Sequence, residues 1–179
     1  RDKVEGSLPD FVGDIVGHEP PYPRIPGTAV FLNRGVASAP LAMRANVNHN
    51  HVLHQQVIIM SIDTLPVPRV PDDERISVDD LGYHDDGIFA VSAKFGYMER
   101  PNVPAALRLV DPARIDGPID LDTVSYFLSK VDLCAGPEPT MAAWRKRLFI
   151  TTAHITADAA GYFGLPLEQT VVIGARIEV

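Results

Sequence analysis

The chain has 179 residues, of which 46% are hydrophobic, and this is enough for one domain with an ordinary packed core. Its formal net charge of −7 argues against a nucleic-acid partner, because such a surface needs a concentrated positive face. The single cysteine, Cys134, excludes an internal disulfide and is typical of a reducing compartment. No apolar run approaches the ~20 residues of a membrane span, so we expect that this chain does not itself cross a bilayer.

The first predicted element is a short amphipathic helix over residues 6–17, with Ser7 placed to cap it. Four prolines follow between positions 20 and 26, which is typical of a stiff extended linker. We therefore predict that residues 1–26 form a strap helix with its linker and that residues 27–179 form the main domain.

Two buried strands and a helix between them are predicted next. The first strand covers 28–33 and the second covers 57–63, since both have unbroken apolar centres. A helix capped by Ser38 connects them, and strands joined by a crossover of this length are expected to be parallel. Between the helix and the second strand lies a polar corner made of three asparagines and three histidines: Asn46, Asn48, Asn50, His49, His51 and His54.

The rest of the chain completes a mixed sheet. Alternating side chains over 75–79 and 89–97 predict an antiparallel hairpin. Further along we predict a helix over 103–110 capped by Asn102, a strand over 123–129, a long helix over 140–163 and a last strand over 171–179. The fold class is therefore α/β, a single domain with a mixed five- to six-stranded sheet flanked by helices.

The histidine cluster suggests a metal, but its spacing disfavours one. His51 and His54 could converge on a helix, whereas His49 and His51, two residues apart, cannot. No carboxylate or cysteine follows at ligand spacing. Neither a G-x-S-x-G nucleophile elbow nor a glycine-rich phosphate loop occurs in the chain. We therefore expect no metal, no cofactor and no catalytic residue, and we interpret the protein as a non-enzyme.

A ligand site remains possible without these motifs, because anions also bind at helix N-termini beside the carboxyl ends of strands. The candidates for ligand binding are His49, Asn50, His54, Arg69 and Arg75. The simpler interpretation of the histidines and asparagines is that they hydrogen-bond free backbone groups at the corner.

Ordered blocks across nearly the whole chain resemble one family. The blocks include Arg24-Ile-Pro-Gly-Thr-Ala-Val-Phe-Leu32, His49-Asn50-x-Val52-Leu53-His54, Phe95-Gly-Tyr-Met-Glu99 and Tyr162-Phe-x-Leu-Pro166. They are similar to blocks in the cytosolic C-terminal domain of Kup-type potassium uptake permeases, the KUP/HAK/KT family. Val47 and His51 depart from the pattern, since the family often has lysines at these positions.

The resemblance implies that a membrane part precedes Arg1 in the whole protein and carries potassium inward together with protons. The absence of an initial methionine also suggests a piece of a longer protein. The chain would then be a regulatory or assembly domain at the cytoplasmic face of the cell membrane. Its partners would be the membrane part of the same polypeptide and a second copy in a homodimer. The alternative is a domain that senses a nucleotide or cyclic dinucleotide, and a more remote one is a free-standing soluble enzyme.

Overall fold

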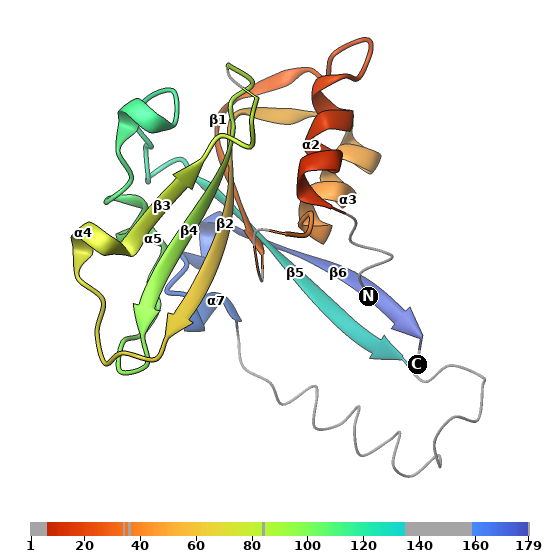
Figure 1. The fold of residues 1–179 in the computed structure, drawn as a ribbon. Coiled ribbons are helices and arrows are strands. Elements are labelled where there is room, and N and C mark those ends of the chain that lie inside the picture. Colours follow the sequence, from red (N-terminus) through yellow and green to blue (C-terminus); the bar gives the residue numbers. More distant parts are fainter. Residues whose placement is uncertain (1–6, 34, 36, 84, 135–158, 179) are drawn as a thin grey trace.

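The computed structural model of the chain describes residues 7–33, 35, 37–83, 85–134 and 159–178 (Figure 1). Its strands are β1 (Arg24–Asn33), β2 (Leu53–Leu65), β3 (Ile76–Asp79), β4 (Ile88–Gly96), β5 (Ser125–Cys134) and β6 (Thr170–Glu178). They form one six-stranded sheet in the order β3-β4-β2-β1-β5-β6. Only the β3–β4 pair is antiparallel among the described strands. The predicted α/β class, with a mixed sheet and one antiparallel hairpin, is confirmed.

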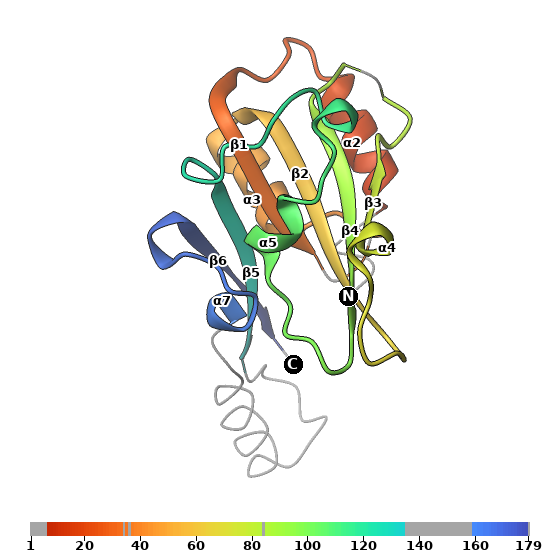
Figure 2. The same cartoon turned by 90° about the vertical axis from the view of Figure 1, so that its left-hand side faces the viewer.

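Helices cover both faces of the sheet, as Figures 1 and 2 show. The helices are α2 (Leu8–Val16), α3 (Leu41–Asn50), α4 (Asp72–Arg75), α5 (Val103–Leu107) and α7 (Ala159–Tyr162), with short 3-10 turns η1 (Pro112–Arg114) and η2 (Leu167–Gln169). Because successive side chains of a strand point to opposite faces, Phe31 packs with α2 and α3, whereas Val30 packs with α5 and α7. The domain therefore has two apolar cores, one on each face.

The helix predicted over 6–17 is present as α2, and its apolar stripe is buried against the sheet. The strand after it begins at Arg24, earlier than expected, because Arg24 and Ile25 pair with the start of β2. The register shifts between Ile25 and Thr28, where Pro26 lacks an N–H and Gly27 has a φ of 102°. The strand therefore continues across the proline. The division of the chain at residue 26 stays a prediction.

The caps were predicted with mixed success. Asn102 does cap α5, because its side chain accepts a hydrogen bond from the Ala105 N–H at 2.8 Å. The prediction for Ser38 was wrong: α3 follows Pro40 without a side-chain cap, and Ser38 bonds through its backbone to Asn33 instead. Most of the long helix predicted over 140–163 lies outside the described residues. The described part of that range contains the short helix α7.

The parallel strands give the sheet a carboxyl end and an amino end. At its carboxyl end, where β1, β2 and β4 finish, the Leu8 N–H donates to the carbonyl oxygen of Ala37 at 3.0 Å. The start of α2 therefore lies at this carboxyl end, and α2 and α3 both run from it to the amino end, where β1, β2 and β4 begin. Within the described residues, no helix has the length and apolar character needed to cross a membrane.

Candidate functional site

The structure separates the five predicted ligand-binding residues into two groups. His49 and Asn50 end α3 and His54 lies near the start of β2, so these three are at the amino end of the sheet. Arg69 and Arg75 follow β2 and lie at the carboxyl end. A strand of 13 residues spans about 40 Å. The two groups therefore do not form one site.

At the amino end, the bracing role falls to an asparagine that was not among the predicted site residues. Asn46 is buried, and its Nδ2 donates to the carbonyl oxygen of Val52 at 3.0 Å while its Oδ1 accepts from Asn50 Nδ2 at 2.9 Å. His51 follows in a left-handed conformation with a φ of 52°, and His49 is exposed. The signal was available in the sequence, because Asn46 and Asn50 are four residues apart on one helix.

Arg24 connects this corner to the β3–β4 hairpin. Its guanidinium donates to the carbonyl oxygens of His54, at 3.0 Å, and Asp86, at 2.8 Å. Burial lowers the pKa of Arg24, although the charge of Asp86 opposes the shift. Burial also raises the pKa of Asp86, against a hydrogen bond from the Ile88 N–H. The two charged groups therefore lie near each other without the close pairing that would favour both charges.

His54 occupies a largely apolar position in the same corner. Its ring meets Phe127 edge-on, with 6.0 Å between the ring centroids. Burial lowers the pKa of the imidazole, and its Nδ1 is buried with no hydrogen-bond partner among the described residues. Burial therefore disfavours the charged imidazole, which is the form that would attract a phosphate group most strongly. Within the described ranges no three His, Cys, Asp or Glu side chains are grouped to hold a metal ion.

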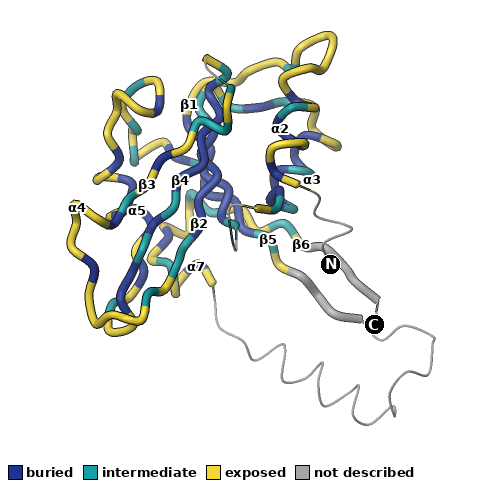
Figure 3. Tube along the Cα trace, viewed as in Figure 1, coloured by how far each residue is buried: buried dark blue, intermediate teal, exposed yellow. Residues whose placement is uncertain are grey.

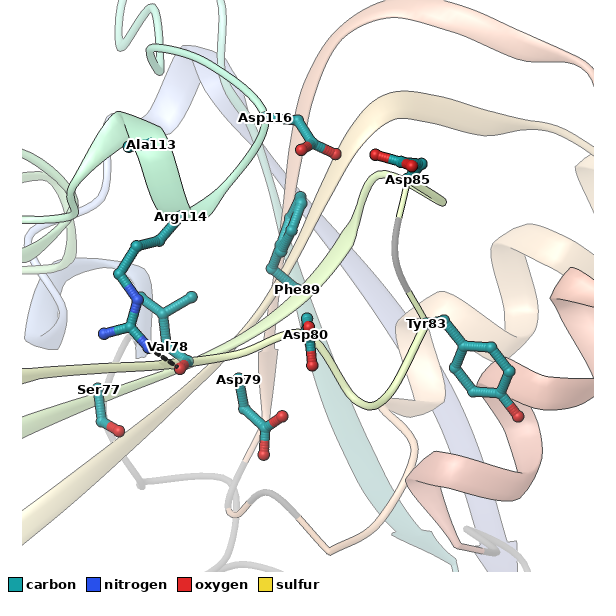
Figure 4. A pocket seen from close by; sticks show the side chains of 10 residues that line it. All are labelled: Ser77, Val78, Asp79, Asp80, Tyr83, Asp85, Phe89, Ala113, Arg114 and Asp116. Carbon is teal, nitrogen blue, oxygen red and sulfur yellow. Dashed lines mark hydrogen bonds between the residues drawn. The ribbon is translucent and has the colours of Figure 1, made fainter.

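A cavity of about 460 Å³ opens beside this corner, between the β3–β4 turn and the segment after η1 (Figure 4). Its acidic lining consists of Asp79, Asp80, Asp85 and Asp116. Arg114 also lines it but donates to the carbonyl oxygen of Val78 at 2.8 Å. Tyr83 points away from the carboxylates in Figure 4, toward α2.

Two of these aspartates have a local structural task. Asp79 accepts a hydrogen bond from the Leu81 N–H at 2.9 Å, and Asp80 accepts one from the Gly82 N–H at 3.1 Å, so both shape the turn. The concentration of carboxylates would repel the phosphates of a nucleotide, since like charges at short range are unfavourable. The cavity therefore does not supply the anion site that the nucleotide alternative requires.

The carboxyl end of the sheet holds a tightly paired arginine. Arg75 donates to Glu99 Oε1 at 2.8 Å, to Asp72 Oδ1 at 3.1 Å and to the carbonyl oxygen of Val70 at 2.6 Å. Its guanidinium carbon lies 4.8 Å from the centre of the Phe95 ring, a cation–π contact. The hydrogen bond that Arg75 donates to Glu99 is the main reason that the pKa of Arg75 is raised, although burial opposes the shift.

Glu99 uses its other carboxylate oxygen to fix two loops. Oε2 accepts hydrogen bonds from the N–H groups of Val70, at 3.0 Å, and Gly96, at 2.7 Å. With the bond from Arg75 as the largest cause, these contacts lower the pKa of Glu99 to about 2. Arg75 is thus committed to structure, and Arg69 beside it is exposed. Sequence reasoning missed Glu99, although it ends one of the blocks that carry the family resemblance.

The comparisons with known proteins agree with this resemblance. The family model described as the K⁺ potassium transporter C-terminal domain matches residues 26–179. A probable potassium transport system protein Kup of Rhodococcus jostii is 65% identical over 179 residues, which is all of this chain and 27% of that protein. A second Kup protein, from Syntrophobacter fumaroxidans, is 34% identical over all of this chain and 27% of its own length. No solved structure gave a significant match.

These matches define the class of protein as a domain of a potassium transport system. The chain belongs to the family of potassium transporter C-terminal domains. It spans about a quarter of the length of the relatives it matches, so their larger parts have no counterpart in it.

Proposed function

We propose that this chain is the cytosolic regulatory and assembly domain of a potassium uptake transporter. In this proposal the ion path and its coupling to protons belong to the membrane part of the same polypeptide, and the domain lies at the cytoplasmic face of the cell membrane. The observation that carries the proposal is the match of the whole chain to only 27% of a potassium transport protein.

The chemistry of the described residues supports a role in control rather than in catalysis. The charged groups at the two ends of the sheet bond mainly to backbone and to each other, as Arg75 and Glu99 do. A domain of this kind acts by having different contacts in two conformations of the transporter, since only differential binding can shift such an equilibrium. A homodimer would give the domain a second surface for the same purpose, and this also stays a prediction.

The test uses the full-length transporter in cells that lack other potassium uptake systems. Ending the chain before Arg24 should lower or deregulate uptake at low external potassium while the membrane abundance of the protein stays unchanged. Uptake rate and abundance are measured on the same cells, because a loss of abundance alone would indicate a folding defect. If the shortened transporter keeps the uptake kinetics of the full-length protein and sedimentation shows a monomeric domain, the proposal is wrong.

A further inference from the structure

Three apolar side chains project from the carboxyl end of the sheet, at two loops far apart in the sequence. Val67 lies in the loop after β2, and Tyr97 and Met98 lie in the turn after β4. Their exposed fractions are 39%, 62% and 67%, and Figure 3 shows both loops as exposed. Isolated exposed apolar residues are ordinary, but a group of three adjacent ones indicates an interaction surface. We call Val67, Tyr97 and Met98 the apolar tip.

Backbone hydrogen bonds hold the apolar tip together. The Tyr97 N–H donates to the carbonyl oxygen of Val67 at 2.9 Å, and the Met98 N–H donates to that of Pro68 at 3.2 Å. The approach is so close that a Cβ on Gly96 would lie 2.3 Å from the Pro68 oxygen. The two loops therefore form one unit, which carries all three exposed apolar side chains.

The charges behind the apolar tip make this unit rigid. Glu99 accepts hydrogen bonds from the backbone N–H groups of both loops. Glu99 is itself held by Arg75, which is buried against Phe95. A surface that is ordered before binding loses less conformational entropy when a partner covers it. The partly buried ion pair thus holds the two loops that carry the exposed apolar groups, which is the arrangement expected of a preformed docking surface.

The position of the apolar tip indicates its partner. Ser7 pairs with Ser38 just beyond the end of β1, so α2 starts at the same carboxyl end of the sheet as the apolar tip. In proteins of the relatives' length, the much larger part lies ahead of this C-terminal domain. That part would therefore join the domain through a helix that starts at the same end of the sheet as the apolar tip.

The charges around the apolar tip favour a protein partner over a lipid surface. Arg69 and Arg100 are exposed on the two loops, but Asp72, Asp73 and Glu74 are exposed on the adjacent α4. An anionic membrane attracts concentrated positive charge, whereas an apolar centre with a rim of mixed charges is typical of a protein–protein contact.

We propose that the apolar tip docks onto the membrane part of the transporter, with Tyr97 and Met98 in contact with an apolar surface on its cytoplasmic side. This inference rests on the proposed function and adds to it the contact surface through which the domain acts. Tyr97 supplies a large ring with few rotatable bonds, and Met98 adapts its shape to an irregular partner, which suits a contact that forms and breaks.

The test is photo-crosslinking in the full-length transporter in native membranes. A benzophenone amino acid replaces Met98 in one variant and Ile25 in a matched control, because Ile25 is also exposed but lies at the amino end of the sheet. A protease site ahead of Ser7 separates the domain from the membrane part after irradiation. Replacing Tyr97 in a third variant guards against a poorly tolerated substitution at Met98.

The expected result is a band that joins the domain to the membrane part, with a several-fold higher yield from position 97 or 98 than from position 25. A crosslink between two domains, a lipid adduct or no crosslink from both tip positions would overturn the inference. Equal yields from positions 98 and 25 would overturn it as well. None of these results affects the uptake test of the proposed function, so the two can fail separately.

Discussion

The two ends of the sheet use the same kinds of residue in opposite ways. At the carboxyl end, Arg75 and Glu99 are paired at 2.8 Å, and each shifts the pKa of the other toward the charged form. At the amino end, Arg24 bonds to backbone carbonyls, and burial shifts the pKa values of Arg24 and Asp86 toward their neutral forms. An arginine near a carboxylate is therefore not by itself a stabilising pair. The geometry decides whether the charges support each other.

This difference matches the roles we assign to the two ends. The paired end supports an exposed apolar surface, which needs a rigid base. The amino end closes the corner between α3 and β2 with amides and backbone groups. The following predictions test the comparison, starting with the largest expected effect.

Replacing Arg75 with methionine should lower the free energy of unfolding of the chain by about 3 kcal/mol, because Glu99 would lose the charged hydrogen-bond partner of a partly buried ion pair. Arg69→Met is the matched control and should change it by less than about 0.5 kcal/mol, because Arg69 is exposed. Urea unfolding at neutral pH measures both. Equal effects of the two substitutions would contradict the role of Arg75.

Gly96→Ala should lower the free energy of unfolding by about 3 kcal/mol, because its Cβ would meet the backbone of Pro68 and Arg69, which cannot move aside cheaply. The control is Gly174→Ala in β6, where nothing lies within 4 Å of the added Cβ. That substitution should be neutral or stabilise the strand by about 0.5 kcal/mol. A neutral Gly96→Ala variant would show that the two loops are not closely joined.

Asn46→Ala should cost about 2 kcal/mol, because the Val52 carbonyl and the Asn50 amide would lose their partner at the corner. The control Asn48→Ala replaces an exposed asparagine of the same helix and should cost less than about 0.5 kcal/mol. His49→Ala should resemble the control. A larger loss for His49→Ala than for Asn46→Ala would return the bracing role to the histidine.

The two ends should also lose stability in different pH ranges. The pKa of Glu99 is lowered, so its contribution is complete above its ordinary value of 4.5 and is lost as the pH falls toward about 2. The pKa of His54 is lowered from 6.5, so the folded state resists its protonation and stability begins to fall below pH 6.5. Unfolding at pH 7.5, 5.5 and 3 measures these changes.

Substitutions of His54 and Glu99 show which residue causes the loss of stability in each pH range. His54→Gln should flatten the change between pH 7.5 and 5.5, whereas Glu99→Gln should flatten the change between pH 5.5 and 3. Identical pH profiles for the two variants would contradict the assignment of each range to one end of the sheet.

Much of the fold could be predicted because its signals are local. The unbroken apolar runs predict parallel buried strands, and the alternation around Val78 and Val91 predicts the hairpin that β3 and β4 form. The extension of β1 across Pro26 could not be predicted, because it depends on pairing with residues that are distant in the sequence.

The site was less predictable for a similar reason. Arg75 was a candidate because of its type, but whether it binds a ligand or pairs internally depends on Glu99, 24 residues further along the chain. The apolar tip was also invisible, since Val67 and Tyr97 meet only when β2 and β4 lie side by side. Ligand binding by His49, Asn50, His54, Arg69 and Arg75 stays a prediction, and calorimetry with ATP, AMP and cyclic di-AMP tests it.

The most direct test of the account is potassium uptake by the full-length transporter with polar substitutions at one end of the domain or the other. Tyr97→Ser with Met98→Ser removes two of the three side chains of the apolar tip. Val16→Ser with Ile25→Ser removes two exposed apolar side chains from the amino end. At equal membrane abundance, we predict that the first pair changes the rate of uptake or its dependence on external potassium, whereas the second pair leaves both unchanged. Unchanged uptake with the first pair, or equal changes with both, would contradict the claim that the domain acts through the carboxyl end of its sheet.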